Sequence, residues 1–331
     1  MGPDPAVAAV RRGVRAVLEP AEPGSPVLVA CSGGADSLAL LAATVFEGHA
    51  RGLRVLGATV DHGLQAGSAE LAQRVVGQMA TLGADETVAS RVVVDGGGLG
   101  VEAAAREARY AVLEQMAQHF GAPLVLLGHT RDDQAETVLM GLARGSGGRS
   151  IAGMRRGFDR FRRPLLDVTR AQTEAACAAE GIEPWQDPFN DDPRFTRSRV
   201  RGVVLPLLEQ ELGPGVAAAL ARTADALRED MEHLDRLTDD LLASALTRRD
   251  DGLHLSLVAL ECADVALRRR ALRRGAVLAG AIDAELGRAH VLALDELVTG
   301  WRGQRWIDLP GPVRGVRRNA AVVIEPVPGD G

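Results

Sequence analysis

Short apolar runs alternate with amphipathic stretches along the first two thirds of the chain. The runs at 27–31, 55–60 and 124–127 have the length and composition of buried strands. Stretches with the apolar spacing of helices separate them, and 101–120 is the longest of these. Repeated strand–helix units of this length predict an α/β fold, with a doubly wound parallel sheet that helices cover on both faces.

The pattern changes after Gly213-Pro214-Gly215, a sequence that predicts a domain boundary. We therefore expect a larger domain over 1–212 and a smaller, mostly helical domain over 213–331. Within the larger domain, glycine and arginine are concentrated in 145–163, which predicts a mobile loop that faces phosphate. Beyond the boundary, helices are expected at 216–247, 264–280 and 286–298.

The composition limits the class of protein. Hydrophobic residues make up 46% of the chain, which is ample for a buried core. No apolar run reaches the length of a membrane span and no signal-peptide pattern begins the chain, so we expect a cytoplasmic protein with no membrane partner. Cys31, Cys177 and Cys262 form no CxxC pair and no metal-ligand spacing, which argues against sulfur-transfer chemistry.

The basic residues are all arginines, and they are clustered although the formal net charge is −6. The clusters fall in 144–163, 194–201, 268–274 and 302–318. A solvated helix face explains any one such cluster. Several of them in an acidic protein favour a polyanionic partner, such as a nucleic acid.

The most informative motif is the hexapeptide Ser32-Gly33-Gly34-Ala35-Asp36-Ser37, which joins a predicted strand to a predicted helix. Its two glycines allow a sharp turn and a close approach to a ligand, and the first amides of the helix favour phosphate. No Gly-Lys-Ser/Thr sequence follows, so this is not the common nucleotide loop. Asp36 is a candidate Mg²⁺ ligand, or it acts on the reacting centre. The motif predicts a nucleotide cleaved between its α and β phosphates, with pyrophosphate held in the loop.

Two further turns follow predicted strands of the same sheet, at Asp61-His62-Gly63 and Gly128-His129. Ligands of such sheets bind at the carboxyl ends of the strands, so these turns and the hexapeptide should line one crevice. We therefore add Asp61, His62 and His129 to the candidate nucleotide-binding residues.

Asp133 and Glu136 lie three residues apart in the first turn of a predicted helix, so their carboxylates face the same way. Acidic residues at this place are also ordinary partners of the helix dipole. Because the helix follows a strand of the same sheet, we favour a functional pair that binds a cation or an amine. Arg109 is either a surface partner of nearby glutamates or part of this site, and Arg201 is a candidate clamp for phosphate.

The order of these segments resembles the tRNA(Ile)-lysidine synthase family. SGGxDS is followed by DHGL, EAAAR, GHxxDDQxET, RGSG and RPLL. The likeness is close over residues 25–212 and looser in the tail. SGGxDS alone would indicate only the N-type ATP pyrophosphatase (PP-loop) superfamily, whose fold is adenine nucleotide alpha hydrolase-like, whereas GHxxDDQxET together with RGSG is far more specific.

The resemblance implies a two-step reaction on the wobble cytidine of an isoleucine tRNA with anticodon CAU. ATP, with Mg²⁺, adenylates the C2 carbonyl oxygen and releases pyrophosphate; free L-lysine then attacks C2 and releases AMP. Asp133 and Glu136 would receive the lysine ammonium group, and Arg109 and Arg201 would neutralise the adenylate. The implied catalytic residues are Asp36, Arg109, Asp133, Glu136 and Arg201. The expected tRNA contacts are Arg149, Arg155, Arg156, Arg197 and Arg199.

Other functions stay open at this point. A sulfur-inserting tRNA-modifying enzyme would share the adenylation step, but the missing cysteine pair weighs against it. An amidotransferase-type synthetase would need a nucleophilic cysteine near the N-terminus or a separate domain, and residue 2 is Gly. A non-catalytic ATP-binding protein would bind ATP and release no pyrophosphate. The oligomeric state is also open, with a homodimer as one option.

Overall fold

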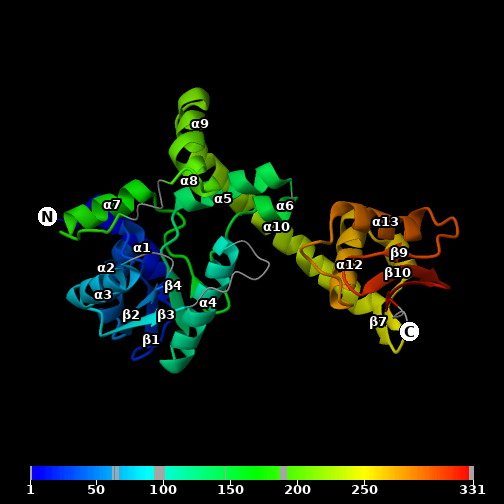
Figure 1. Cartoon of the computed structure of the whole chain (residues 1–331), viewed down its shortest axis with the longest axis horizontal. Coiled ribbons are helices and arrows are strands. Elements are labelled where there is room, and N and C mark those ends of the chain that lie inside the picture. Colours follow the sequence, from blue (N-terminus) through cyan, green and yellow to red (C-terminus); the bar gives the residue numbers. More distant parts are fainter. Residues whose placement is uncertain are drawn as a thin grey trace. The chain divides into compact units, whose positions relative to one another are not determined.

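The computed structural model describes residues 2–61, 63, 67–92, 101–145, 147–186 and 192–327, with the backbone alone for 101–105. The chain divides into two compact units, Met1–Arg228 and Glu229–Gly331 (Figure 1). Helix α10 (Val216–Ala245) contains the division between them. The domain limits expected from the sequence, near residue 213, stay a prediction. His62 lies outside the described residues, and so does its predicted contact with the nucleotide.

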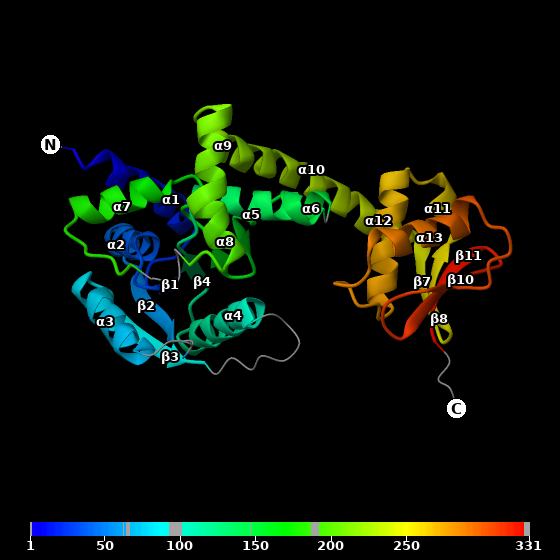
Figure 2. The same ribbon diagram turned by 45° about the horizontal axis from the view of Figure 1, so that its top comes forward.

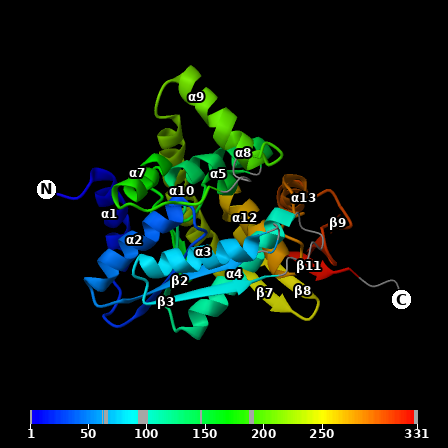
Figure 3. The same cartoon turned by 60° about the vertical axis from the view of Figure 1, so that its left-hand side comes forward.

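Within the described residues, the first unit is built on a six-stranded sheet with the order β3-β2-β1-β4-β6-β5. Neighbouring strands pair in parallel except in the β5–β6 hairpin, so the predicted doubly wound parallel sheet is confirmed. Figure 3 shows β2 and β3 side by side, with α3 alongside them. The strands are β1 (Pro26–Ala30), β2 (Arg54–Asp61), β3 (Glu86–Arg91), β4 (Leu124–Leu127), β5 (Gly157–Phe158) and β6 (Phe161–Arg162).

Helices cover both faces of this sheet because successive side chains along a strand point to opposite sides. Val27 and Val29 of β1 are buried in one cluster with side chains of α1, α2, α3 and α7, whereas Leu28 joins a second cluster with Leu113 and Met116 of α4. Figure 2 shows α2 and α4 on opposite sides of the strands. The helices are α1 (Pro5–Leu18), α2 (Ala35–His49), α3 (Ser68–Thr81), α4 (Val101–His119), α5 (Arg131–Arg144) and α7 (Arg170–Ala179).

The expectation of a mobile loop over 145–163 is wrong. Its described residues contain helix α6 (Gly148–Ile151) and the β5–β6 hairpin. Phe161 pairs with Val125 of β4 and is buried, and its ring stacks on Phe158 with 5.1 Å between centroids. The abundance of glycine and arginine favoured a loop in the sequence analysis. The two aromatic side chains, which pack the hairpin against the sheet, outweigh it.

Helix α8 (Thr196–Arg199), the π-helix η2 (Val200–Val204) and helix α9 (Leu205–Leu212) follow one another directly. Pro206 lacks an N–H and its ring clashes with the carbonyl four residues before it, so a regular α-helix cannot continue through this point. The Leu205 amide instead donates to the carbonyl oxygen of Val200, five residues earlier. Arg201 lies inside this π-helical turn.

The second unit combines helices with an antiparallel sheet of order β7-β8-β11-β10-β9 in its described residues. The described residues contain no single helix long and apolar enough to cross a membrane; Thr196–Leu212 and Val216–Ala245, bent by 99°, meet the length and composition test only as a pair. After α10, the elements of the second unit are β7 (Leu246–Arg249), β8 (Gly252–Ser256), α11 (Leu257–Cys262), α12 (Val265–Leu278), α13 (Arg288–Thr299), β9 (Ile307–Asp308), β10 (Val313–Arg318) and β11 (Ala321–Pro326).

Candidate active site

The site forms where the strand order reverses, between β1 and β4. The chain leaves β1 toward β2 on one side and leaves β4 toward β6 on the other, so a crevice opens at their carboxyl ends. Gly128 brings the two turns together, because a Cβ atom at this position would lie 3.1 Å from backbone atoms of Asp36 and Ser37. The hexapeptide and the Gly128-His129 turn therefore share one site, as predicted.

The hexapeptide folds as a tight turn before α2. Gly33 has φ +86°, a left-handed conformation that favours glycine. The Ser32 amide donates to Ser37 Oγ over 3.1 Å, and the two serine hydroxyl oxygens lie 3.3 Å apart. Gly34 is the N-cap of α2 and has no side chain to occupy the first-turn amides. The loop thus presents backbone N–H groups and the Ser32 hydroxyl, which suit phosphate, while the Ser37 hydroxyl donates to the Gly34 carbonyl oxygen over 2.9 Å.

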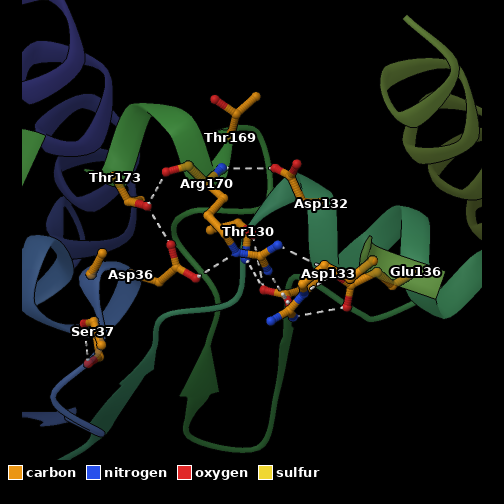
Figure 4. A network of polar contacts seen from close by, with 12 residues as sticks. Asp36, Ser37, Thr130, Asp132, Asp133, Glu136, Thr169, Arg170 and Thr173 are labelled. Atoms are coloured by element: carbon orange, nitrogen blue, oxygen red, sulfur yellow. Dashed lines mark hydrogen bonds and ion pairs between the residues drawn. The ribbon is translucent and has the colours of Figure 1, made fainter. Parts of the chain in front are cut away.

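Asp36 is held by two residues of α7 that sequence analysis missed (Figure 4). Thr173 Oγ1 donates a hydrogen bond to Asp36 Oδ1, and Arg170 Nε lies 3.7 Å from Oδ2. Burial raises the pKa of Asp36 to about 6, although the hydrogen bond from Thr173 and the charge of Arg170 act in the opposite direction. The carboxylate is therefore partly desolvated at the entrance of the phosphate loop.

Asp133 caps a helix with one carboxylate oxygen and contacts two arginines with the other. Its Oδ2 accepts a hydrogen bond of 2.8 Å from the Thr130 amide, which caps α5. Its Oδ1 lies 3.2 Å from Arg170 and 3.3 Å from Arg201. The neighbouring Asp132 holds Arg170 from behind, accepting a hydrogen bond of 2.8 Å from its amide.

Glu136 is fully buried and faces three arginines. Its carboxylate oxygens lie 2.7 Å from Arg201 Nε, 2.8 Å from Arg197 Nε and 3.4 Å from an Arg170 terminal nitrogen. Arg197 and Arg201 are four residues apart on the α8–η2 helix, so both reach the same carboxylate. With Asp36 and Asp133, three carboxylates face three guanidinium groups, an arrangement of balanced charge. Of the three carboxylates, Asp36 and Asp133 keep some side-chain exposure and Glu136 keeps none.

The other wall of the site is rich in arginine and aromatic side chains. Arg109 of α4 lies 5.7 Å from the ring centroid of Tyr110, and its buried Nε has no hydrogen-bond partner in the described structure. Burial lowers the pKa of Arg109, and the charges of Arg106 and Arg197 act in the same direction. His129 lies against Arg163, another residue that sequence analysis missed. Arg109 is a half-buried cation whose Nε has no partner in the described structure, which favours an anionic ligand at this place.

The contacts described for the remaining predicted residues are with other groups. Asp61 accepts a hydrogen bond of 2.8 Å from the Gly63 amide at the end of β2. Arg156 is exposed and pairs with Asp167 at 2.6 Å. Arg199 donates to the Pro193 carbonyl oxygen over 2.6 Å. Arg149 and Arg155 are exposed, so of the five expected tRNA contacts only Arg197 belongs to the buried network.

Comparisons with known proteins agree with this geometry. A family model described as a PP-loop domain matches residues 8–208. The tRNA(Ile)-lysidine synthase of Thermobifida fusca is 51% identical over 323 residues, which cover 98% of each chain. That of Streptomyces coelicolor is 46% identical, over 98% of this chain and 99% of its own. U34-tRNA thiolase NcsA from Methanococcus maripaludis shares the fold, with a TM-score of 0.57 and 16% identity over 68% of this chain and 80% of its own. The chain belongs to the tRNA(Ile)-lysidine synthase family of PP-loop proteins.

Proposed function

We propose that this protein ligates lysine to C2 of the wobble cytidine in the isoleucine tRNA with anticodon CAU, through an adenylated tRNA. The observation that carries the proposal is the contact between Gly128 and the hexapeptide, because it joins a phosphate loop to a cluster of carboxylates and arginines. Adenylation needs the phosphate loop, and capture of an amine needs the cluster of carboxylates and arginines. The family assignment supports the same reaction.

The first half-reaction takes place at the loop. The amides of the α2 N-terminus and the hydroxyls of Ser32 and Ser37 bind the departing pyrophosphate. Arg109 and Arg201 neutralise the charge that develops on the adenylate. Mg²⁺ fits this site as a partner of the nucleotide: Asp36 supplies one carboxylate, and the described residues contain no cluster of three acidic, His or Cys ligands. Asp36 would hold this ion, which neutralises phosphate charge when bound.

The second half-reaction takes place at the carboxylates. The lysine ammonium group enters beside the carboxylates of Asp36 and Asp133, whose side chains are 24% and 11% exposed, and displaces the contacts of Arg170. Glu136 completes the acidic wall and keeps Arg197 and Arg201 in place. As the amine attacks C2, a carboxylate of this group takes its proton, and the bond from C2 to the adenylated oxygen breaks so that AMP leaves.

The tRNA partner is bound through arginine. Arg149, Arg155, Arg156 and Arg199 lie on the surface and contact phosphates, whereas Arg197 acts at the carboxylates. The wobble base leaves the anticodon stack to enter the crevice, which costs less in a loop than in a duplex. A cytoplasmic location and a homodimer belong to the same proposal; sedimentation velocity tests the second.

A labelled-lysine assay tests the function. The protein is incubated with ATP, Mg²⁺, radiolabelled lysine and a transcript of the isoleucine tRNA with anticodon CAU, and pyrophosphate is measured in parallel. We expect label in the tRNA and one pyrophosphate per lysine. ATP binding without either product would favour a non-catalytic ATP-binding protein, and pyrophosphate release without lysine would favour a different nucleophile.

A further inference from the structure

Arg163 is a buried arginine at the edge of the site. It follows β6 directly and is 5% exposed, and its guanidinium carbon lies 5.1 Å from the centroid of the Phe158 ring. His129 follows β4 by two residues, and β4 and β6 are parallel neighbours with Leu126 opposite Arg162. The carboxyl ends of two adjacent parallel strands therefore bring Arg163 and His129 together.

Arg163 donates hydrogen bonds from three of its nitrogens. Nε donates to His129 Nδ1 over 3.3 Å, and the two terminal nitrogens donate to the Arg155 carbonyl oxygen over 2.5 Å and to the Tyr110 hydroxyl oxygen over 3.1 Å. The three acceptors lie between α6 and β5, in the turn after β4 and in helix α4, so the guanidinium group is fixed from several sides.

The chemistry of arginine dictates the state of the histidine. A guanidinium group is always charged and has donors only, so a ring nitrogen facing it must be an acceptor. Nδ1 of His129 therefore carries no proton, and the ring holds its proton on Nε2. A doubly protonated ring would place N–H against N–H.

The surroundings act in the same direction. Burial lowers the pKa of His129 well below its ordinary value, and the charges of Arg163, Arg109, Arg197 and Arg106 lower it further. The ring therefore stays neutral through the physiological range, where a free histidine titrates.

We propose that Arg163 is a positioning residue that holds His129 as the neutral tautomer with Nε2–H, so that His129 offers a fixed hydrogen-bond donor to the reacting nucleotide or cytidine. A neutral donor stabilises charge that develops on an oxygen atom without becoming an acid itself. The tautomer stands on the geometry alone; the use of the donor rests on the proposed function.

Nitrogen NMR of the full-length protein tests the tautomer without substrates. Protein labelled with ¹⁵N-histidine has seven ring systems, and a His129→Gln sample identifies the signals of His129. We expect an unprotonated Nδ1 and a protonated Nε2 that do not change between about pH 5.5 and 8. A proton on Nδ1, or protonation of both nitrogens within that range, overturns the proposal.

Variants of the partner residues separate positioning from folding. Arg163→Gln removes the charge and the Nε donor, and we expect signals of the second tautomer or of the charged ring to appear. Tyr110→Phe removes one acceptor of Arg163 but keeps the bond to Nδ1, so it should leave the tautomer unchanged. An Arg163→Gln spectrum identical to wild type overturns the proposal. If that variant does not fold, the wild-type and Tyr110→Phe spectra still decide it.

Activity tests the use of the donor. The side-chain amide of Gln at position 129 places an N–H near Nε2, whereas that of Asn places it near Nδ1. We expect His129→Gln to retain at least about tenfold more pyrophosphate release than His129→Asn. If the wild-type protein incorporates lysine and both variants lose pyrophosphate release equally, this use of the donor is contradicted. A wild-type protein that incorporates no lysine would instead refute the proposed function and leave the NMR result standing.

Discussion

Arg201 Nε lies 2.7 Å from Glu136 Oε1, and the Glu136 side chain is fully buried. Removing the charge of Glu136 takes from Arg197 and Arg201, each 26% exposed, the fully buried carboxylate that they share. We expect Glu136→Gln to lower the free energy of unfolding by about 3 kcal/mol, and to reduce both half-reactions. Urea unfolding measures the first effect. Asp167→Asn, which removes the charge of one of two carboxylate partners of Arg156 in a pair that is more than half exposed, is the control and should change stability far less.

Asp36 makes stability depend on pH. Its pKa of about 6 in the folded chain lies above that of an unfolded aspartate, so the folded state binds more protons and the free energy of unfolding falls as pH rises from about 4 to about 6. Asp36→Asn removes this loss, which amounts to about 2–3 kcal/mol above pH 6. The stability difference between variant and wild type should therefore grow with pH across this window. A constant difference would contradict the raised pKa.

We expect the same carboxyl to set the acid side of the activity profile. In the proposed first half-reaction Asp36 acts in its ionised form, so pyrophosphate release should fall as pH drops through about 6. Thr173 donates to the ionised form and lowers the pKa of Asp36. Thr173→Val removes that bond at nearly constant volume, and we expect the acid limb to move to higher pH. If the limb stays in place in this variant, another group controls it.

A substitution of Asp133 should affect the two half-reactions differently. Asp133→Asn keeps an oxygen that can accept from the Thr130 amide but removes the negative charge offered to the lysine ammonium group. We expect lysine incorporation to fall at least about tenfold more than pyrophosphate release. Asp132→Asn changes the preceding residue, which accepts only from the Arg170 amide in the described contacts, and should leave both steps nearly unchanged. Equal losses in the two steps for Asp133→Asn would refute this division.

Position 128 requires glycine because neighbouring backbone atoms leave no room for a side chain, and not because of its backbone conformation. A Cβ there meets the backbone of Asp36 and Ser37 at 3.1 Å, so Gly128→Ala should push the loop away and weaken ATP binding. Gly77 of α3 has open space around its Cβ position, and Gly77→Ala should leave ATP binding unchanged and raise stability by about 0.5–1 kcal/mol. Calorimetric titration with ATP compares them.

The cysteines test the sulfur-transfer alternative. Burial raises the pKa of the Cys31 thiol to about 12 and that of Cys177 to about 11, so neither is a thiolate at neutral pH. A variant with Cys31→Ala, Cys177→Ala and Cys262→Ala should keep most of its lysine incorporation. Loss of activity in a folded triple variant would show that a thiol takes part.

The local pattern of apolar and polar residues was sufficient to predict much of the fold. The apolar runs at β1, β2 and β4 are short and bounded by polar turns, so their strand character does not depend on distant residues. The hairpin of Phe158 and Phe161 was missed because two-residue strands have no period to detect, and their pairing with β4 is a tertiary contact. The π-helical turn before Pro206 was missed for a similar reason, since proline predicts an interruption but not its form.

The sequence by itself determined the phosphate loop, the parallel sheet and the candidates Asp36, Asp133 and Glu136, because motif spacing and strand order place them at one crevice. Only the tertiary structure decided their partners. Thr173 lies 137 residues from Asp36, and it arrives there because Ala176 and Cys177 of the same helix are buried in the core with α1 and α2. Side-chain pairs so distant along the chain depend on how helices pack, and no local spacing encodes that.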